Sequence, residues 1–263
     1  MEIIENCLIV AAGKGTRLKA AGDIKPLVDL CGAPLIEHAM ASAAAAGVRR
    51  FVVVTGYQAP ILEQAIDRIR TRRGWRISTV FNPRFDESNG LSVICGEALL
   101  AAEPFYLAMC DHVVEPEIYR ALLRAEPPPE AVALGVDFRL SNPDVDLDDV
   151  TRVRIDNGEI KAIGKSLTDY QAYDVGVFRA ACALFDAIRV SAAGGDSSIS
   201  GGMNRLAAAG RALSVDINIA RWIDVDSEAM LARARAWVKN RPAWQYDSVQ
   251  KKGASPLFAP QRT

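Results

Sequence analysis

The sequence predicts an α/β protein whose mixed, mostly parallel sheet lies between layers of helices. Two observations lead to this class. Short apolar runs alternate with helical patterns through the first half of the chain, and those runs are apolar on both faces, which is typical of strands covered by helices on each side. At 263 residues, half of them hydrophobic, the chain can bury a large core. In this architecture ligands bind at the carboxyl ends of the strands.

The first half of the chain contains four predicted strands and four predicted helices. The strands cover residues 7–12, 50–56, 76–82 and 105–111, and the helices cover residues 34–47, 60–70, 91–102 and 115–125. Pro34 in the first turn and Gly47 at the end are the expected limits of the first helix. The fourth strand ends on an acid, Asp111.

The pattern changes after residues 126–130, where three consecutive prolines exclude a helix. The later elements are a strand over 131–138, a hairpin over 148–165, a strand over 172–180, a helix over 181–190, and a strand, an acidic turn and a helix within 214–240. Asn157-Gly158 is the expected two-residue turn of the hairpin. We therefore expect one domain over 1–240, with a smaller β-rich part after residue 126, and a tail or linker over 241–263.

Composition narrows the function classes. The formal net charge is −1, so charge alone gives no reason to expect nucleic-acid binding. Five scattered cysteines without a C-x-x-C pair, and only two histidines, argue against a structural zinc site or a disulfide framework. The start lacks the features of a signal peptide, and no segment reaches the roughly 18 apolar residues of a membrane span. We expect a soluble, cytoplasmic protein with reduced thiols.

The stretch LIVAAGKGTRLKAAGDIKPLV, residues 8–28, runs from a strand into a glycine-rich turn. Gly13 and Gly15 carry no side chain that would keep backbone N–H groups from a ligand. Lys14, Arg17 and Lys25 add three cations, which suits a triphosphate. The spacing fits neither the dinucleotide fingerprint nor the P-loop. By itself, Gly-Lys-Gly also fits an ordinary surface turn.

Three elements in order, AAGKGTRL, then KPL, then the loop and helix CGAPLIEHAM, resemble the signature of nucleotidyltransferases that make sugar and alcohol nucleotides. The match covers residues 8 to about 40, and weaker features extend it to about 239. The resemblance implies a Rossmann-like fold of the nucleotide-diphospho-sugar transferase type, with a nucleotide-binding half over 1–125 and an acceptor-binding half over 126–240. In such enzymes a substrate phosphate attacks the α-phosphorus of a nucleoside triphosphate and releases pyrophosphate without a protein nucleophile.

The resemblance also implies roles for residues of this chain. Arg17 would hold the leaving phosphates, and Lys25 would hold the reacting α-phosphate. The predicted nucleotide-binding residues are Ala11, Ala12, Gly13, Lys14, Gly15, Thr16, Asn89, Gly90 and Ser92. The Asn-Gly-x-Ser form of the last three suits the cytidylyltransferase branch, and the alternative is a plain helix N-cap at Ser88 or Asn89.

A magnesium ion is the cofactor that the resemblance implies, and Mg²⁺ binds carboxylates together with phosphate oxygens and water. Family members carry a Gly-Asp where this chain has Cys110-Asp111, and a Trp-x-Asp-x-Asp-like run where it has Trp222 to Asp226. We expect Asp111 and Asp224 to be metal ligands. Asp226 is either a further ligand or the N-cap of the helix that follows.

Candidates for binding the acceptor lie mainly in the second half. Lys165 would bind the acceptor's phosphate, and Asp174 would accept hydrogen bonds from its hydroxyl groups. His112 would either orient the acceptor or cap a loop. The acidic run NPDVDLDD, residues 142–149, is expected to be a solvated loop rather than a metal site.

The runs MCDHVVEPEIYRALL and WIDVDSEAM, with the hairpin region, look most like inositol-1-phosphate cytidylyltransferases, which make CDP-inositol from CTP. The expected partners are therefore small-molecule substrates. Several of these enzymes are fused to a membrane-embedded CDP-alcohol phosphotransferase, so coupling to such an enzyme is a further hypothesis. Phosphocholine, phosphonates and sugar 1-phosphates remain alternative acceptors, and Tyr170, Tyr173 and Phe178 could form an aromatic cage for choline.

Two other classes stay open at this point. A glycosyltransferase on the same architecture would carry a metal-binding Asp-x-Asp where this chain has Asp111-His112-Val113. A regulatory paralogue that binds nucleotide without turnover should have lost Lys25, Asp111 or Asp224, and all three are present.

Overall fold

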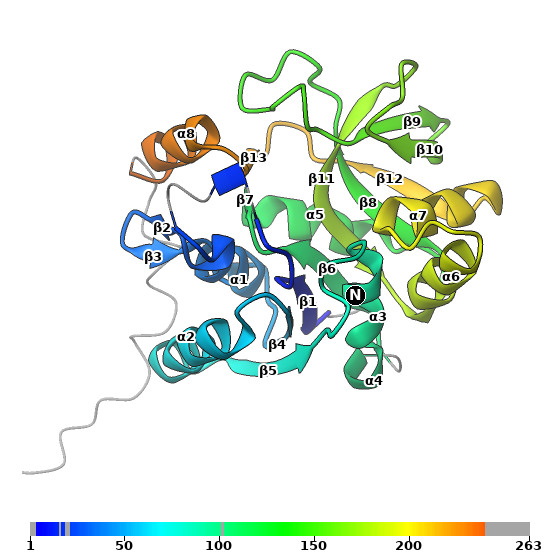
Figure 1. The fold of residues 1–263 in the computed structure, drawn as a ribbon. Helices are drawn as coiled ribbons and strands as arrows, with labels where there is room; N and C mark the ends of the chain where they lie inside the picture. Colours follow the sequence, from blue (N-terminus) through cyan, green and yellow to red (C-terminus); the bar gives the residue numbers. More distant parts are fainter. Residues whose placement is uncertain (1–3, 16, 19–21, 101–102, 240–263) are drawn as a thin grey trace, which may run out of the picture.

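The computed structural model describes residues 4–15, 17–18, 22–100 and 103–239 (Figure 1). The predicted tail over 241–263 lies outside these residues. The main sheet has nine strands: β1 (Asn6–Val10), β4 (Arg50–Thr55), β5 (Arg76–Phe81), β6 (Phe105–Met109), β8 (Val132–Asp137), β9 (Arg152–Asp156), β10 (Glu159–Gly164), β11 (Ala172–Ala180) and β12 (Ala212–Asp216).

The other elements cover the sheet or border its carboxyl edge. The helices are α1 (Leu35–Ala45), α2 (Ala59–Arg73), α3 (Gly90–Cys95), α4 (Glu97–Leu100), α5 (Pro116–Ala125), α6 (Cys182–Ala193), α7 (Ile199–Ala208) and α8 (Glu228–Lys239), with a short 3-10 turn, η2 (Lys25–Leu27). Two small ribbons pair β2 (Asp29–Leu30) with β3 (Ala33–Pro34), and β7 (His112–Val114) with β13 (Trp222–Asp224).

The strand order is β5-β4-β1-β6-β11-β8-β12-β10-β9, and the predicted α/β class with a mixed sheet is confirmed. Strands β5, β4, β1 and β6 pair in parallel, as do β8 and β12. β11 is antiparallel to both β6 and β8, so a strand from the second half of the chain completes the sheet beside the first half. The two halves of the chain therefore share one sheet.

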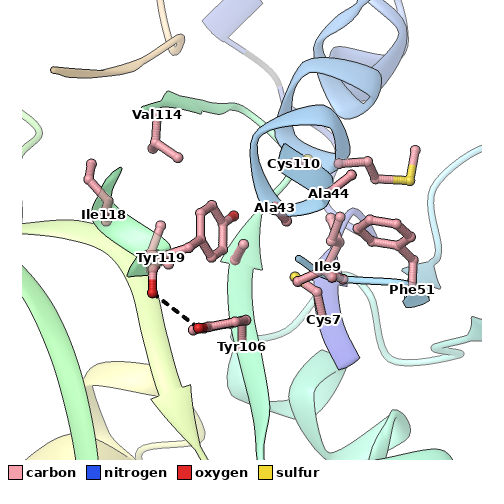
Figure 2. Close-up of a cluster of buried hydrophobic side chains, with 14 of the residues drawn as sticks. Cys7, Ile9, Ala43, Ala44, Phe51, Tyr106, Cys110, Val114, Ile118 and Tyr119 are labelled. Carbon is pink, nitrogen blue, oxygen red and sulfur yellow. Dashed lines mark hydrogen bonds between the residues drawn. The ribbon is translucent and has the colours of Figure 1, made fainter. Parts of the chain in front are cut away.

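Alternating side chains of β1 show why its apolar run is continuous. Cys7 and Ile9 face a core formed with helices α1, α2 and α5, whereas Leu8 and Val10 face a second core formed with α3, α6 and α7. Figure 2 shows the first core, in which the Tyr106 hydroxyl donates to the backbone oxygen of Tyr119 at 3.1 Å. Each fully buried aliphatic side chain contributes about 1.5–3 kcal/mol of transfer free energy.

A third apolar cluster fixes the position of the segment that contains Lys25. It joins α8 to the β7–β13 ribbon and to the segment between the glycine-rich turn and α1, through buried residues such as Leu18, Val28, Val113, Ile223 and Trp237. This packing brings the Lys25 segment against a strand that follows it by about two hundred positions. The chemistry of the site depends on that juxtaposition.

The structure departs from the predicted elements in several places. The helix expected over 91–102 is divided at Gly96 into α3 and α4. A Cβ at residue 96 would lie 2.5 Å from a Leu8 methyl group, so glycine is needed for this close approach to β1. The fourth strand ends at Met109 rather than at residue 111. Helix α7 was not predicted, because Gly201 and Gly202 weaken its helical pattern; a Cβ on Gly202 would lie 2.6 Å from Ile188 of α6.

The predicted hairpin is confirmed. β9 and β10 pair antiparallel across Asn157-Gly158, whose φ angles are 50° and 82°. Both values lie in the left-handed region that a two-residue primed turn requires. The hairpin carries Lys165 just after β10.

Candidate functional site

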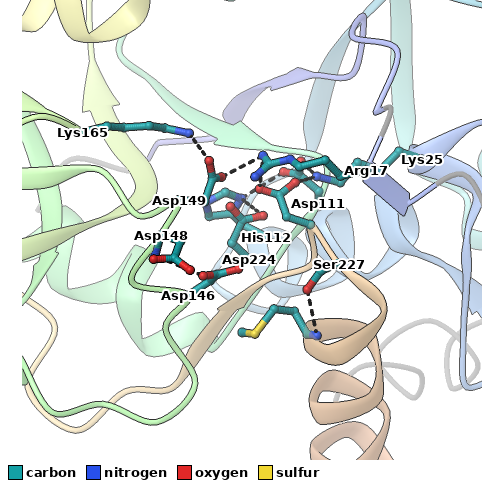
Figure 3. A network of polar contacts seen from close by, with 12 residues as sticks. Arg17, Lys25, Asp111, His112, Asp146, Asp148, Asp149, Lys165, Asp224 and Ser227 are labelled. Atoms are coloured by element: carbon teal, nitrogen blue, oxygen red, sulfur yellow. Dashed lines mark hydrogen bonds and ion pairs between the residues drawn. The ribbon is translucent and has the colours of Figure 1, made fainter.

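The candidate site lies at the carboxyl ends of β1 and β6, where the sheet meets the β7–β13 ribbon (Figure 3). Two cavities adjoin there. The glycine-loop cavity, about 320 Å³, is lined by the chain after β1 and by Lys25. The hairpin-side cavity, about 260 Å³, is lined by Lys165, Asp174 and the loop after β8. The two cavities share Arg17, Asn89, Met109, Asp111 and Asp226.

Gly15 allows Lys25 to reach this site. Its φ of +57° lies in the left-handed region, and a Cβ there would lie 2.4 Å from Cβ of Lys25. Glycine is therefore needed for packing against Lys25, in addition to the open approach predicted from the sequence. Gly13 has no atom within 4 Å of its would-be Cβ and faces the open cavity.

Lys25 is buried in η2 and joins two of the predicted metal carboxylates. Its ammonium lies 2.6 Å from Asp111 Oδ2 and forms a second ion pair with Asp226. Burial lowers the pKa of Lys25, but the charges of Asp111 and Asp224 outweigh that effect and raise the pKa overall. Lys25 is therefore a fixed positive charge in the glycine-loop cavity, beside the two carboxylates that both cavities share.

Arg17 enters the site from the glycine-rich turn and contacts both sides of it. Its guanidinium lies 2.8 Å from Asp226 Oδ2 and 2.8 Å from Asp149 Oδ2. Lys165 approaches the same Asp149 from the hairpin, with its ammonium 2.5 Å from Oδ1 (Figure 3). Arg17 and Lys165 come from segments far apart in the sequence and meet at one carboxylate.

His112 lies between the two strand-end carboxylates. Its Nδ1 donates to Asp111 Oδ1 at 2.9 Å and lies 3.7 Å from Asp224 Oδ1, and its ring stacks on Trp222 at 6.2 Å between centroids. Burial lowers the pKa of His112, but Asp224 and Asp111 outweigh it and raise the pKa to about 9. The imidazole is therefore a cation at neutral pH. Burial raises the pKa of Asp111, but Lys25 and His112 bring it well below its ordinary value.

The carboxylates at the junction fit a divalent cation. Oxygens of Asp149, Asp224 and Asp226 lie within 4.8 Å of one another, and so do the ligand atoms of Asp111, His112 and Asp224. Asp224 Oδ1 is buried and accepts no hydrogen bond from the described part of the chain. Burial raises the pKa of Asp224, with His112 acting in the opposite direction. A hard cation would satisfy that oxygen and stabilise the ionised form.

The contacts of Ser227 and Asp226 show which of the two is the N-cap of α8. Ser227, directly before α8, accepts a hydrogen bond from the backbone N–H of Met230 at 3.3 Å, which is the N-cap arrangement. The carboxylate of Asp226 instead pairs with Arg17 and Lys25. The N-cap alternative for Asp226 is therefore wrong.

The predicted nucleotide-binding residues divide into two groups. Ala11, Gly13, Gly15 and Asn89 line the glycine-loop cavity. Four others make different contacts. Ala12 is buried and its backbone oxygen accepts from Tyr57 N–H, and Lys14 pairs with Asp86 at 2.5 Å. Ser92 is buried and its hydroxyl oxygen accepts from the Asn82 amide, and Gly90 packs against Ser197. Thr16 lies outside the described residues. The N-cap alternative for Asn89 is not supported, since its side-chain oxygen accepts from Ile199 N–H of α7 instead.

The predicted acceptor residues Lys165, Asp174 and His112 all line the hairpin-side cavity. Asp174 Oδ1 accepts the backbone N–H of Gly176 at 2.7 Å. Burial raises the pKa of Asp174 to about 6, against smaller opposite effects of that hydrogen bond and of His112. Near neutral pH this carboxylate accepts hydrogen bonds, which suits a polyhydroxylated ligand.

The aromatic cage considered for choline does not form. Tyr173 is 1% exposed and donates to Leu140 O, and Tyr170 packs under the Arg152 guanidinium at 5.2 Å. Of the three aromatic candidates, only Phe178 lines the hairpin-side cavity within the described chain.

Sequence reasoning missed Asp149. Residues 142–149 form a loop, as predicted, but this loop lines the hairpin-side cavity instead of lying free in solvent. Asp144 is 8% exposed and pairs with Arg221 at 2.6 Å, and Asp149 pairs with Arg17 and Lys165. The density of acids in NPDVDLDD was the available signal, but nothing local tells which acid meets a distant cation.

A family model described as the MobA-like NTP transferase domain matches residues 7–146. A "Bifunctional IPC transferase and DIPP synthase" of Rubrobacter xylanophilus is 34% identical over 222 residues, which is 83% of this chain and 48% of the relative. A protein of the same name from Thermococcus kodakarensis is 26% identical over 88% of this chain and 50% of its own length. This chain thus spans about half the length of these curated relatives.

Solved structures show the same fold. An inositol-1-phosphate CTP transferase from T. maritima superposes with a TM-score of 0.79 at 24% identity, covering 91% of this chain and 98% of that one. A UDP-glucose pyrophosphorylase in complex with UDP-glucose gives a TM-score of 0.74 at 20% identity, with coverages of 91% and 100%. Across the described residues, no helix combines the length and apolar character needed to cross a membrane.

Proposed function

This chain belongs to the family of MobA-like NTP transferase domains, and from that premise we propose that it transfers a cytidylyl group from CTP to inositol 1-phosphate. The products are CDP-inositol and pyrophosphate. The observation that carries this proposal is the junction of the two cavities, which share Arg17, Asp111 and Asp226. A nucleotide in the glycine-loop cavity and a phosphorylated alcohol in the hairpin-side cavity would meet at that junction.

The chemistry requires positioning and charge neutralisation rather than a protein nucleophile. An oxygen of the acceptor phosphate attacks the α-phosphorus and forms the new P–O bond. The bond from the α-phosphorus to the α,β-bridging oxygen breaks, and pyrophosphate departs with that electron pair. The attacking phosphate is already ionised, so no proton must be removed from it. Lys25 faces the developing charge at the α-phosphorus, and Arg17 binds the leaving phosphates.

Asp111, Asp224 and Asp226 are the proposed ligands of Mg²⁺. The buried oxygen of Asp224, which accepts no hydrogen bond from the described residues, supports this role. Bound there, the cation would neutralise phosphate oxygens and help to align the two substrates. Lys25 and Arg17, which pair with Asp111 and Asp226, hold these carboxylates in place.

The choice of substrates is supported by the relatives and by the second cavity. The similar T. maritima structure is described as an inositol-1-phosphate CTP transferase, and the curated relatives are named IPC transferases. Lys165 would bind the acceptor's phosphate, and Asp174 would accept hydrogen bonds from inositol hydroxyls. The buried Tyr173 and the covered Tyr170 disfavour choline.

The setting of the reaction is part of the same proposal. Five free cysteines are compatible with a reducing compartment, and we place the enzyme in the cytoplasm, where CTP is available. The relatives' name joins a transferase to a synthase, so we propose that the CDP-inositol made here is consumed by a membrane CDP-alcohol phosphotransferase, in the same polypeptide or a separate one.

Pyrophosphate release with a matrix of substrates tests the proposal. The four nucleoside triphosphates are each combined with inositol 1-phosphate, phosphocholine, a phosphonate and glucose 1-phosphate at saturating Mg²⁺, and products are identified by mass spectrometry. We expect the highest kcat/KM for CTP with inositol 1-phosphate and a product mass of CDP-inositol.

Any other substrate preference would support one of the alternative functions. Preference for glucose 1-phosphate would make the chain a sugar-1-phosphate nucleotidyltransferase, and preference for phosphocholine or the phosphonate would change the acceptor. Tight CTP binding without pyrophosphate release from any pair would support a non-catalytic regulatory protein. A separate assay with a nucleotide sugar in place of the triphosphate tests the glycosyltransferase alternative, which sugar transfer would support.

A further inference from the structure

Asp149 connects the two exposed cations of the site. One of its oxygens lies 2.8 Å from the Arg17 guanidinium and the other lies 2.5 Å from the Lys165 ammonium. The side chains of Arg17 and Lys165 are 53% and 56% exposed, so both remain accessible to a ligand. Hydrogen bonds from Arg17 and Lys165 outweigh the effect of burial and lower the pKa of Asp149.

Asp149 belongs to a loop that is anchored at its beginning. We call residues 138–151, between β8 and β9, the acidic loop. Buried Asp137 accepts hydrogen bonds from Arg139 and Asn142, and Asp144 pairs with Arg221. The later part of the loop, Asp146–Val150, is a turn closed by the Val150 N–H to Asp146 O bond at 2.9 Å. The ion pairs of Asp149 connect this turn to the glycine-rich loop and to the hairpin.

We propose that the Asp149 carboxylate competes with a substrate phosphate for Arg17 and Lys165, and that phosphate binding displaces the turn at residues 146–150. The ligand class is a phosphate monoester or a pyrophosphate group. This inference deepens the proposed function, on which it rests for the identity of the two substrates. It makes Asp149 a residue that sets phosphate affinity.

The physical basis is the matching of charges. A carboxylate carries one negative charge, whereas a phosphate monoester carries close to two near neutral pH and offers three acceptor oxygens. Two half-exposed ion pairs are individually weak, so a more highly charged ligand can replace them. Weak internal pairing keeps Arg17 and Lys165 directed at the site and still lets phosphate bind.

Phosphate binding to Asp149→Asn and Asp148→Asn tests this proposal. Both variants remove one negative charge from the same turn. Asp148 is exposed and lines neither cavity, so its variant is the matched control. Calorimetry measures the Kd of inorganic pyrophosphate in one arm and of inositol 1-phosphate in the other, with the full chain, with and without MgCl₂. Hydrogen exchange of the peptide covering 140–151 reports on the loop.

We expect Asp149→Asn to lower the Kd of at least one ligand roughly three- to tenfold, while Asp148→Asn stays within about twofold of the parent chain. The arm that tightens shows whether the leaving phosphates or the acceptor phosphate take the place of Asp149. In the parent chain, ligand should speed amide exchange over 140–151. In Asp149→Asn, exchange should already be fast without ligand.

Equal affinities for the two variants would overturn the proposal, as would slower exchange of the loop on ligand binding. So would weaker, MgCl₂-dependent binding in Asp149→Asn, because that result would make Asp149 a metal ligand. Neither measurement needs turnover. Absence of CDP-inositol synthesis would therefore refute the proposed function alone, and normal synthesis with equal affinities would refute only this inference.

Discussion

A Cβ atom on Gly176 would lie 2.5 Å from Cδ2 of His112. Gly176 has a φ of +75° and sits in an irregular part of β11, where the register with β8 shifts between Asp174 and Phe178. Such irregularities re-aim a strand near an active site. Here the bend lets the His112 ring lie between Trp222 and the two carboxylates, with no side chain in its way.

Gly176→Ala should therefore disturb the site more than a surface glycine change does. We expect a loss of about 1–3 kcal/mol in the free energy of unfolding, because the left-handed backbone and the contact with His112 both oppose a methyl group. The rate should fall at least about tenfold as His112 moves. Urea unfolding and kcat measure the two effects. Gly164→Ala, which meets no atom within 4 Å, is the control; equal behaviour of the two variants would contradict the assigned role of Gly176.

Lys25→Ala should lower kcat by roughly 10²–10³, the range found when one charge-stabilising donor is removed from an active site. The variant also leaves Asp111 without its ammonium partner. Steady-state pyrophosphate release measures the effect. Lys161→Ala, an exposed change on β10, should keep the normal rate. A near-normal rate for Lys25→Ala would remove this residue from the proposed mechanism.

Asp111→Asn should raise the Mg²⁺ concentration for half-maximal rate on the order of ten- to a hundredfold. Folding should change far less, because Lys25 keeps Asp226 as a partner. A magnesium titration of the rate and a thermal melt test this pair of expectations. Unfolding of the variant with unchanged magnesium use would refute the metal assignment.

The pH dependence of stability should change in Asp174→Asn. The folded-state pKa of Asp174 is about 6, above the ~3.9 of an unfolded aspartate, so the folded chain binds this proton more tightly. Stability from this group is thus present below about pH 4 and is lost as the pH rises through 6. Asp174→Asn has no carboxyl group to deprotonate, so its stability does not fall in this way as the pH rises. Its Tm should exceed that of the parent by a few degrees at pH 7.5 but not at pH 4. Asp148→Asn is the control. The same Tm difference between Asp174→Asn and the parent at pH 4 and at pH 7.5 would contradict the raised pKa that burial gives Asp174.

Much of the fold could be predicted from local patterns in the sequence. The apolar runs that became β1, β4 and β5 and the helical periods of α1, α2 and α5 are locally consistent, and Asn157-Gly158 determines its own turn. The three-residue strand β7 and the glycine-containing α7 were not readable, because neither is stable alone. β7 exists through its pairing with β13, and α7 through close packing on α6.

The site likewise contains residues that the sequence located and contacts that only the structure located. The amino-acid sequence by itself determined that a glycine-rich turn follows β1, that Arg17 and Lys25 come soon after it, and that Asp111 and Asp224 lie at or next to strand ends, because motif spacing and strand ends are local properties. Only the tertiary structure decided that Ser227 caps α8 while Asp226 pairs with Lys25, and that Asp149 joins Arg17 to Lys165. The physical reason is that an ion pair depends on distance in space. Burial of the third apolar cluster, which no short pattern encodes, sets the distances between Lys25 and its partners more than eighty residues away.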